Sequence, residues 1–417
     1  MVQLSDDCFA TGSALMTVEA AVELIGARLP VVAEAETVPL SSADSRIAAE
    51  DVFAANDLPP FANSAVDGYA VRHADLAPEG ETILPVSGRL AAGATHSVSA
   101  AGCAVRIFTG APMPAGADTV FMQEDTRRDA DSVTLPAGLR KGSNMRPAGE
   151  DVARGTRIIP AGHRLRPQDL ALATATGIGR IAVRRKLRVA IFSTGDELTE
   201  AGGQLAPGAI YESNRVLVST FLQRVGADVS DLGILRDDPA MLTRALHAAA
   251  PNHDLILTTG GVSTGEEDHV KSVMEQLGRV MFWRLAIKPG RPLAMGVIAG
   301  TPAVGLPGNP VAVYVTLALF VRPLLARLGG AIFVPPVPQQ VRSQFKARKR
   351  LGRREYLRVS IERAADGTLE ARKFPKEGAA LLTSLTESDG LAELDDHVKS
   401  VAPGDMVAFY PHALLWS

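Results

Sequence analysis

The sequence predicts a multidomain protein of mixed α/β and β structure, with a doubly wound parallel α/β domain near its centre. Its 417 residues are enough for about 2.8 domains at roughly 150 residues each. Between about residues 185 and 330, short apolar runs alternate with capped helical stretches, as in a parallel sheet covered by helices. Residues 38–185 are instead rich in Gly, Pro, Val and Thr, which is typical of small β units.

Composition and charge exclude several classes of protein. Hydrophobic residues make up 46% and charged residues 21%, ordinary values for a globular chain. The 43 basic and 46 acidic side chains leave a formal charge of -3, so we expect no nucleic-acid partner. Cys8 and Cys103 are the two cysteines, too few for a disulfide framework or a four-thiolate metal site.

Export and membrane insertion are not expected either. The first basic side chain is Arg28, so the N-terminus lacks the charged start of a secretory signal. The most apolar run, 311–321, stops at Arg322-Pro323 and is too short to span a bilayer. We therefore expect a cytoplasmic protein without a membrane partner.

The central domain is predicted element by element. Four apolar runs are expected strands: 187–193, 229–235, 255–259 and 303–306. Three stretches are expected helices: 216–225, 239–250 and 310–328. Ser213-Asn214 can cap the first helix, which ends at Gly226, and Asp238 can cap the second. Outside this domain, residues 14–28 predict an isolated amphipathic helix, and VPPVP at 334–338 predicts a stiff linker before a strand-rich C-terminal domain.

The most informative segment is TTGGVSTGEEDH, residues 258–269. Its paired glycines, Gly260 and Gly261, let backbone N–H groups approach an anion, and the helix that follows adds its positive end. Acidic residues at 266–268 lie at the same helix start, where they could simply complement the helix dipole. This segment alone does not decide between the two interpretations.

Two further acidic loops favour a site. Residues 194–197 (TGDE) follow one predicted strand, and Asp237-Asp238 follow another. The carboxyl ends of parallel strands meet at one edge of a sheet, where such folds bind ligands. Carboxylates beside a phosphate repel it unless a cation lies between them, and their hard oxygens suit Mg²⁺. The pattern predicts a nucleotide or phosphoester handled with Mg²⁺.

Basic residues occur in a fourth loop, WRLAIKPGRP (283–292), which places Arg284, Lys288 and Arg291 around a Pro-Gly turn. Alone, it is better interpreted as an ordinary surface turn. In a fifth loop, LPGNP (306–310), Pro310 at the first helical position leaves the helix start open to an anion. Five such loops at one sheet edge together predict a binding site.

Polar turns and basic residues also occur outside the central domain. The stretches 59–70, 109–112 and 146–151 are turn-rich and, taken singly, better explained as structure than as catalysis. The C-terminal domain has a basic run at 342–358 that fits either a solvated strand face or an oxyanion-binding surface. A nucleic-acid ligand is disfavoured, because single-stranded nucleic acids stack on aromatic side chains and this run lacks them beyond Phe345 and Tyr356.

Ten motifs in this order resemble the MoeA family of molybdopterin molybdenumtransferases, which includes the E domain of gephyrin. The resemblance extends from about residue 14 to the C-terminus. The motifs are PPFANSAVDGYAV, IFTGAPMPAGADTVFMQED, RPAGEDV, STGDEL, YESN, GILRDD, TTGGVSTGEEDH, WRLAIKPGRP, LPGNPVAV and GRREYLR.

The resemblance implies four domains, a homodimer and a reaction. The domains are an elongated N-terminal domain (1–37 and 141–184), an inserted β-domain (38–140), a molybdopterin-binding α/β domain (185–330) and a C-terminal β-barrel (338–417). Each active site of the family lies between the α/β domain of one subunit and the N-terminal domains of the other. The reaction joins molybdate to adenylylated molybdopterin and releases AMP with Mg²⁺, the final step of molybdenum cofactor biosynthesis. An adenylyltransferase of the same pathway and molybdoenzyme apoproteins are further expected partners.

The resemblance also implies roles for individual residues. Asp67 and Thr109 would complete the site of the other subunit, and the expected catalytic or metal-binding acids of the α/β domain are Glu197, Asp237 and Asp268. Molybdate would be held by Lys288, Arg291, Arg353 and Ser388. The remaining substrate-binding positions are Gly260, Gly261, Ser263, Pro307, Gly308 and Asn309. Arg284 and Arg291 stand where the family often has lysine, which keeps the charge and changes its geometry.

Two other functions stay open from the sequence. The related adenylyltransferase is little more than the α/β domain, so the long flanking regions argue against that step. A gephyrin-like scaffold could reuse the fold, although a scaffold has no need of the acidic residues. The sequence does not separate molybdate from tungstate, since both are tetrahedral dianions of similar size.

Overall fold

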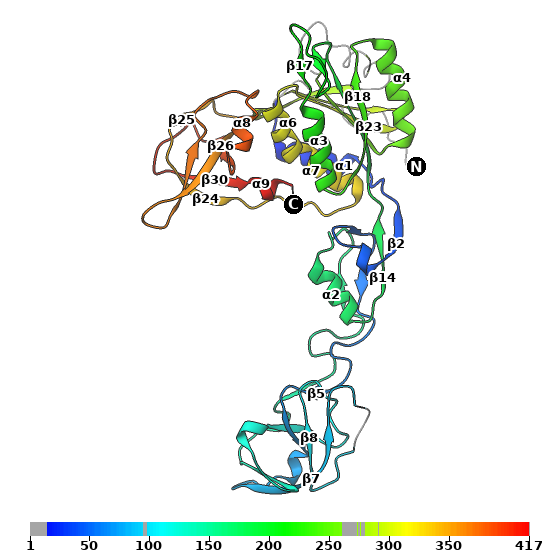
Figure 1. Ribbon diagram of the computed structural model, residues 1–417, viewed down its shortest axis with the longest axis vertical. Coiled ribbons are helices and arrows are strands. Elements are labelled where there is room, and N and C mark those ends of the chain that lie inside the picture. Colours follow the sequence, from blue (N-terminus) through cyan, green and yellow to red (C-terminus); the bar gives the residue numbers. More distant parts are fainter. Residues whose placement is uncertain are drawn as a thin grey trace.

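The molecule is elongated. Its α/β domain and C-terminal barrel together form one end, a narrow middle unit follows, and a small β unit forms the other end (Figure 1). A computed structural model describes residues 15–94, 98–260, 273, 276, 280–290 and 292–416. The α/β domain and the barrel lie side by side. The chain passes through the middle unit once on the way to the β unit and once on the way back. This architecture confirms the predicted fold class; the residue boundaries of the domains stay a prediction.

The α/β domain is built on a seven-stranded sheet in the order β1-β20-β22-β23-β19-β15-β18. The strands are β1 Leu15–Met16, β15 Arg188–Thr194, β18 Asp228–Leu235, β19 Leu255–Thr259, β20 Val280–Leu285, β22 Pro292–Ile298 and β23 Thr301–Leu306. Strands β18, β15, β19 and β23 pair in parallel, as predicted. Strand β22 is antiparallel to β20 and β23, because Ala299 and Gly300, both with positive φ, form a two-residue turn before β23. The sheet is therefore mixed rather than wholly parallel.

Helices cover both faces of this sheet, which confirms the doubly wound arrangement. They include α1 Val18–Arg28, α3 Asn214–Arg224 and α4 Pro239–Ala249. Helices α1 and α3 contribute to one hydrophobic cluster and α4 to the other. Asp238 caps α4, as predicted, by accepting two backbone N–H groups. Ser213 occupies the N-cap position of α3, as predicted, but its side chain makes no capping bond, and the Glu212 carboxylate accepts the backbone N–H of Arg215 instead.

The long apolar helix predicted over 310–328 is present, and it continues past Arg322-Pro323, where its most apolar run was expected to stop. It comprises α6 Pro310–Thr316, a π turn Leu317–Val321 and α7 Arg322–Gly329. The widened turn ends two residues before Pro323 and rearranges the backbone bonds that proline would otherwise break. Among the described residues, Pro310–Gly329 is a helix long and apolar enough to cross a membrane, so the expectation that it is too short is wrong. Of its most apolar window, 78% is buried inside the protein, and packing in the α/β core accounts for that hydropathy.

The N-terminal segment belongs to the same core. Strand β1 extends the sheet by pairing with β20, with Leu15 opposite Arg284. Thr17 then caps α1 by accepting the backbone N–H of Ala20, and buried Ile25 packs in the cluster that includes α7. The helix predicted over 14–28 is therefore shorter than expected, and it is not isolated.

The middle and terminal units are mainly β structure. The middle unit has β2 Ala35–Pro39, β3 Ile47–Ala48, β4 Val52–Phe53, β13 Arg157–Ile159, α2 Pro167–Ala175 and β14 Arg180–Arg184. The β unit has a six-stranded sheet of β6 Gly68–Val71, β7 Thr82–Leu90, β8 Ala104–Ile107, β9 Thr119–Met122, β10 Arg127–Asp129 and β11 Ser132–Leu135. At its junction with the middle unit, β5 Asn63–Ser64 pairs with β12 Met145–Arg146. Each unit has its own hydrophobic cluster, so neither depends on the α/β core.

The C-terminal region forms a closed five-stranded barrel, as predicted. Its strands are β24 Gln339–Ser343, β26 Arg354–Arg363, β27 Leu369–Lys373, β28 Gly390–Leu394 and β30 Met406–Pro411, and pairing of β26 with β28 closes it. Smaller elements are β25 Ala347–Arg348, α8 Thr383–Thr386, β29 Ser400–Val401 and α9 His412–Leu415. Strand β21, Ile287–Lys288, leaves the α/β domain and pairs in parallel with β26. This pairing fixes the barrel against the α/β domain.

Candidate functional site

The loops that follow β15 and β19 touch at the carboxyl edge of the sheet. Gly260 has φ +85°, and a Cβ atom at this position would lie 2.7 Å from the carbonyl oxygen of Thr194. Only glycine allows that approach, because any side chain would force the two loops apart. Of the residues predicted in this loop, Gly261, Ser263 and Asp268 lie outside the described residues. Gly260 therefore anchors the described part of the predicted phosphate loop beside the loop of Glu197.

The Glu197 carboxylate folds back over its own loop. Gly195 has φ +146°, and a Cβ there would lie 2.5 Å from Oε2 of Glu197. The loop is held by a short parallel pair, β16 Leu198–Thr199 and β17 Ile210–Tyr211, and by a bond from the backbone N–H of Ile210 to the carbonyl of Glu197. Glu197 is exposed, so its carboxylate is available to a ligand while its backbone is fixed.

Buried polar atoms without a partner lie at the same edge. The hydroxyl oxygens of Thr194 and Thr258 and Oδ1 of Asn214 make no hydrogen bond within the described part of the protein. A buried polar atom without a partner costs about 1–3 kcal/mol, and such atoms are expected where a ligand or water completes the bonding. From the sequence, Asn214 was predicted only as part of a helix cap. Its place in the YESN motif was the signal that could have identified it as a site residue.

The LPGNP loop lies next to Asn214. The side-chain amide of Asn214 donates to the carbonyl of Gly308 at 2.7 Å. Gly308 and Asn309 are exposed and Pro307 is buried, and Asn309 occupies the N-cap of α6 without a side-chain capping bond. Asn214 thus joins the start of α3 to the start of α6, and both helix starts face the described sheet edge.

The acidic residues of this edge fit Mg²⁺ as partial ligands. Asp237 lies two residues after the end of β18 and is half-buried, while neighbouring Asp238 is occupied as a helix cap. Within the described ranges, the group of three possible metal ligands within 4.8 Å is 395–397 on the barrel. Glu197 and Asp237 therefore form no closed set of ligands there. Mg²⁺ is usually held by one or two carboxylates together with waters and phosphate oxygens, which agrees with this arrangement.

A buried carboxylate brings together two of the predicted basic residues. Nζ of Lys288 donates to Oε2 of Glu355 at 3.1 Å, and Nη2 of Arg353 donates to Oε1 at 2.8 Å. The side chain of Glu355 is 5% exposed. The backbone pairing of Lys288 with Glu355 between β21 and β26 places all three charges at the junction of the α/β domain and the barrel.

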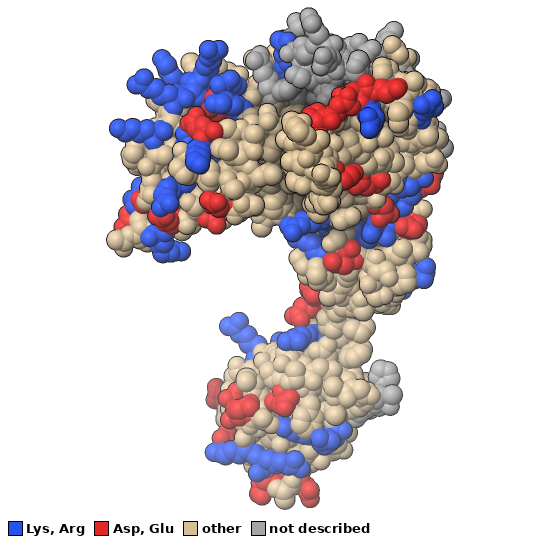
Figure 2. All heavy atoms as spheres, turned by 45° about the horizontal axis from the view of Figure 1, so that its top comes forward, with Lys and Arg blue, Asp and Glu red and all other residues tan. Residues whose placement is uncertain are grey.

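This junction opens into a basic cleft of about 310 Å³. Its lining includes Lys288 and Glu355, and further basic side chains come from the barrel: Lys346, Arg348, Arg358, Lys373 and Lys376. Figure 2 shows Lys and Arg gathered on the barrel. We call this space the barrel cleft. Cations that outnumber carboxylates favour an oxyanion as its ligand.

Arg358 is the most constrained cation of the barrel cleft. Its Nε donates to the hydroxyl of Ser384 at 3.0 Å, and its Nη2 donates to the carbonyl of Gly378 at 3.0 Å. Burial lowers the pKa of Arg358. In the sequence, Arg358 belongs to a basic run that predicts no specific role for it, and Ser384 was not predicted as its partner because 26 residues separate the two.

Ser388, which was expected beside Arg353, has other partners. Its hydroxyl lies 3.1 Å from Nε2 of His412, and His412 is bonded through Nδ1 to the buried hydroxyl of Tyr314. Ser388 is not among the residues that line the barrel cleft. The structure therefore places Ser384, and not Ser388, next to a cation of the cleft.

Asp67 and Thr109 meet in the β unit. The backbone N–H and the hydroxyl of Thr109 both donate to Oδ1 of Asp67, each at 2.8 Å. These bonds, the backbone one first, lower the pKa of Asp67. The β unit lies at the end of the molecule opposite the α/β domain (Figure 1). Within one chain, the structure pairs Asp67 with Thr109 and does not bring them to the sheet edge.

Comparisons with known proteins cover nearly the whole chain. Residues 16–177 match the family model for the MoeA N-terminal region (domain I and II), residues 190–327 match a probable molybdopterin binding domain, and residues 340–412 match the MoeA C-terminal region (domain IV). The molybdopterin molybdenumtransferase of Haemophilus influenzae is 36% identical over 95% of this chain and 98% of its own length. Molybdopterin molybdenumtransferase 2 of Mycobacterium tuberculosis is 36% identical over 88% of this chain and 93% of its own. Among solved structures, a molybdopterin biosynthesis moeA protein of Pyrococcus horikoshii has TM-score 0.81 and 29% identity, covering 95% of this chain and all of that one.

Proposed function

Because this chain belongs to the MoeA family of molybdopterin molybdenumtransferases, we propose that it inserts molybdate into adenylylated molybdopterin and releases AMP. The observation that carries this proposal is the pairing of two unlike sites in one body. An edge with acidic residues, glycine-rich loops and unpartnered polar atoms lies on the domain whose barrel junction holds a basic cleft. A substrate with a phosphoanhydride and an oxyanion co-substrate requires both kinds of site.

The acidic edge is proposed to bind the adenylyl end of the substrate. Glu197 and Asp237 would hold Mg²⁺ together with Asp268, and Mg²⁺ would neutralise the phosphate oxygens while the anhydride is cleaved. Backbone N–H groups around Gly260 and at the open start of α6 at Asn309 would donate to phosphate or pterin oxygens. The unpartnered oxygen of Asn214 would accept a donor group of the pterin, which is rich in N–H groups.

The barrel cleft is proposed to bind molybdate. Lys288 and Arg358 approach it from the α/β domain and the barrel, and a guanidinium offers two parallel donors to a tetrahedral oxyanion. The Ser384 hydroxyl accepts from Arg358 and donates its own proton to the carbonyl of Leu381 at 2.6 Å, so its proposed role is to position the guanidinium. Glu355 fixes Lys288 and Arg353 before the anion arrives and so reduces the ordering cost of binding.

A homodimer is proposed to complete the site. Asp67 and Thr109 belong to the β unit, which lies at the end of the molecule opposite the α/β domain (Figure 1), and a second copy could bring the same pair to the sheet edge. The two bonds from Thr109, which lower the pKa of Asp67, stabilise its carboxylate form, as a group directed at a substrate donor or a metal-bound water requires. Closed two-fold dimers are the commonest oligomers.

AMP release tests the proposal directly. Purified protein is mixed with adenylylated molybdopterin and Mg²⁺, with and without molybdate, and AMP is measured by chromatography. We expect AMP to form in a molybdate-dependent way and to fall by more than tenfold when Mg²⁺ is chelated. AMP release that is equally fast without molybdate would contradict the insertion function.

A further inference from the structure

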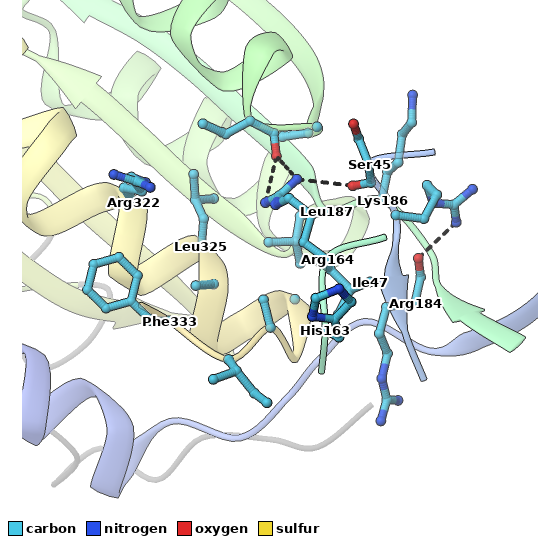
Figure 3. Close-up of a pocket in the computed structure, with 18 of the residues that line it drawn as sticks. Ser45, Ile47, His163, Arg164, Arg184, Lys186, Leu187, Arg322, Leu325 and Phe333 are labelled. Atoms are coloured by element: carbon cyan, nitrogen blue, oxygen red, sulfur yellow. Dashed lines mark hydrogen bonds between the residues drawn. The ribbon is translucent and has the colours of Figure 1, made fainter. Parts of the chain in front are cut away.

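A second basic space lies between the middle unit and the α/β domain, away from the edge that holds the proposed active site. Its volume is about 640 Å³. It borders the amino-terminal ends of the parallel strands, at Leu187 before β15 and Ala227 before β18, and the end of α7 at Gly329. Figure 3 shows it, with Arg322 and Phe333 on one side and Arg164 on the other. We call it the hinge cavity, and neither the proposed function nor the comparisons assign it a ligand.

The charges that line the hinge cavity are mostly positive. Eight lysine or arginine side chains line it, against one carboxylate, that of Asp44. The eight are Arg46, Arg164, Arg166, Arg184, Arg185, Lys186, Arg224 and Arg322. Four of them have carboxylate partners, in the pairs Arg46–Glu36, Arg166–Asp169, Arg185–Asp254 and Lys186–Asp228. Across the described ranges, Arg164, Arg184 and Arg224 form no ion pair, which leaves several positive charges uncompensated.

The contacts of Arg164 explain how one of these charges is held. Its guanidinium donates to the carbonyl of Ser45 at 3.0 Å and to the carbonyl of Val225 at 3.4 Å. Ser45 belongs to the middle unit and Val225 to the end of α3, so Arg164 bridges the two parts through neutral oxygens. Burial lowers its pKa, and burial followed by the charge of Arg164 lowers the pKa of Arg322. Two like charges face one cavity, an arrangement that a bound anion would stabilise.

Arg184 adds a donor that has no acceptor. Its Nη1 and Nη2 donate to the carbonyls of Ala33 and Ala49, while Nε is buried and makes no hydrogen bond with the described residues. A buried guanidinium N–H without an acceptor carries the full cost of desolvation. This Nε of Arg184 and the guanidinium of Arg164, which is bonded only to carbonyls, both lack an anionic acceptor among the described residues. Their arrangement therefore fits a site for a bound anion better than a complete set of ion pairs.

The walls of the cavity determine the size and kind of anion. Apolar side chains of Leu187, Leu325 and Phe333 stand beside the cations (Figure 3). An inorganic ion would leave this apolar wall unused, and 640 Å³ is within the range of pockets that hold drug-sized ligands. Guanidinium groups match phosphate oxygens through paired donors, and an aromatic side chain can stack against a planar base.

We propose that the hinge cavity binds a phosphorylated small molecule of nucleotide size. Its phosphates lie on Arg164, Arg184 and Arg224, and its apolar ring lies against Leu325 and Phe333. The ligand contacts both the middle unit and the α/β domain, so its binding stabilises one angle between them. This inference does not depend on the proposed molybdate insertion.

Isothermal titration calorimetry on the full chain tests this inference, with ATP, AMP, pyrophosphate and adenosine as probes and without Mg²⁺ or molybdate. We expect ATP to bind most tightly, pyrophosphate at least fivefold more weakly, and adenosine without measurable heat. Affinity for ATP should fall steeply as salt is raised from 50 to 300 mM, because the contacts are ionic. Equal affinities for ATP and pyrophosphate would overturn the nucleotide part of the proposal.

Substitutions then locate the binding. Arg164→Met and Arg184→Met should each weaken ATP binding at least tenfold, and Arg224→Met, at an exposed position, at least threefold without affecting the fold. Arg363→Met is the matched control, because Arg363 also donates to a backbone carbonyl, that of Gly367, but on the barrel. Circular dichroism and thermal unfolding check each variant, and Arg164→Lys, which retains the charge, covers the case in which Arg164→Met fails to fold. The proposal would be overturned if Lys288→Met abolished ATP binding while Arg224→Met and Arg164→Lys left it unchanged. That result would place the nucleotide in the barrel cleft.

Discussion

The barrel cleft and the hinge cavity are both basic spaces at a junction between two parts of the chain, and each is organised by one buried carboxylate. In the cleft, Glu355 binds Lys288 and Arg353. Beside the cavity, Asp254 binds Arg185 and Arg188. The difference lies in which cations remain available to a ligand.

At the cleft, one of the two cations bound to the acid, Lys288, also lines the proposed substrate site, whereas Arg353 is not among the lining residues. The Lys288 side chain is 53% exposed while Glu355 is 5% exposed. The buried carboxylate therefore binds the amine on its inner side, and the amine stays accessible to a ligand from solvent. At the cavity, Asp254 takes up Arg185, and separate guanidiniums, those of Arg164 and Arg184, stand without a carboxylate partner among the described residues. A preorganised pair suits a small anion that must react, while guanidiniums held by neutral carbonyls suit an anion that stays bound.

The largest expected effect separates the two regions by activity. Arg358→Met should reduce molybdate-dependent AMP release by more than 100-fold, because the oxyanion would lose its two parallel donors and the Ser384 hydroxyl its partner. Arg224→Met, which removes an equal charge from the hinge cavity, should change the rate in the absence of added nucleotide by less than twofold. Initial rates over a molybdate series measure both. A similar loss in the two variants would mean that overall charge, and not the position of the cation, controls the reaction.

Much of the fold and the acidic edge could be predicted because their signals are local. The alternation of apolar runs with caps such as Asp238 indicates parallel strands, and the edge at which their loops meet follows from topology alone. The antiparallel strand β22 and the pairing of β1 with β20 were not predicted. Leu15 and Arg284 are distant in the sequence, and nothing in either segment indicates the other as its partner.

The two basic regions were harder to predict for the same physical reason. Arg164 and Arg184 lie 20 residues apart on the returning passage of the chain through the middle unit, and no motif connects either of them with Arg224 of α3. Likewise, Ser384 follows a loop of the barrel, and the sequence predicted this domain only as strand-rich, without individual contacts. A basic run shows how many cations are present, but only packing determines which of them has a carboxylate partner.

The next effect concerns stability at the hinge. Burial raises the pKa of Asp254, but bonds from Arg185 and Arg188 more than offset it, so the folded-state value lies below the ordinary one. Its contribution is therefore complete above the unfolded pKa of about 4 and is lost as pH falls toward the folded value. Asp254→Asn should cost about 2–3 kcal/mol at pH 7, and the difference from wild type should shrink below pH 4.

Differential scanning calorimetry across pH 3 to 7 measures that difference. Asp228→Asn is the control, because Asp228 is 64% exposed and 3.7 Å from Lys186, and an exposed pair contributes about 0–1 kcal/mol. A constant destabilisation of Asp254→Asn at every pH would assign the effect to packing and not to charge.

A smaller loss of stability is expected at the cleft. Glu355→Gln retains the shape and removes the charge that Lys288 and Arg353 share, which should cost about 1–2 kcal/mol, since Lys288 is half exposed and solvent replaces part of the interaction. The affinity of the Glu355→Gln variant for molybdate should nevertheless change by less than its kcat. Lys288 and Arg353 keep their charge in this variant, but the carboxylate no longer holds them in position. Urea unfolding and the split between KM and kcat measure the two effects. A tighter KM with an unchanged kcat would show that Glu355 opposes the anion rather than positioning its ligands.

The last prediction concerns the third region, the β unit, which in one chain lies far from both basic spaces. The proposed dimer places Asp67 of one subunit at the sheet edge of the other, so Asp67→Asn and Glu197→Gln should each inactivate a homodimer through different subunits. In a mixed dimer, one site then carries both lesions and the other carries none. Random exchange of equal amounts makes half of the dimers mixed, so about a quarter of the wild-type sites should recover, by counting and on the premise of a closed two-fold dimer.

Subunit exchange is confirmed independently, by purification of heterodimers that carry two different affinity tags. Isolated heterodimers should have about half of the wild-type activity, because one of their two sites is intact. Mixing Asp67→Asn with Thr109→Ala is the matched control, since Thr109 donates both of its bonds to Asp67 of the same chain. In that mixed dimer each site carries one lesion from the same pair, and no recovery above the parents is expected. Verified heterodimers of the first kind that stay as inactive as their parents would place Asp67 outside the partner's site and remove the need for a shared active site.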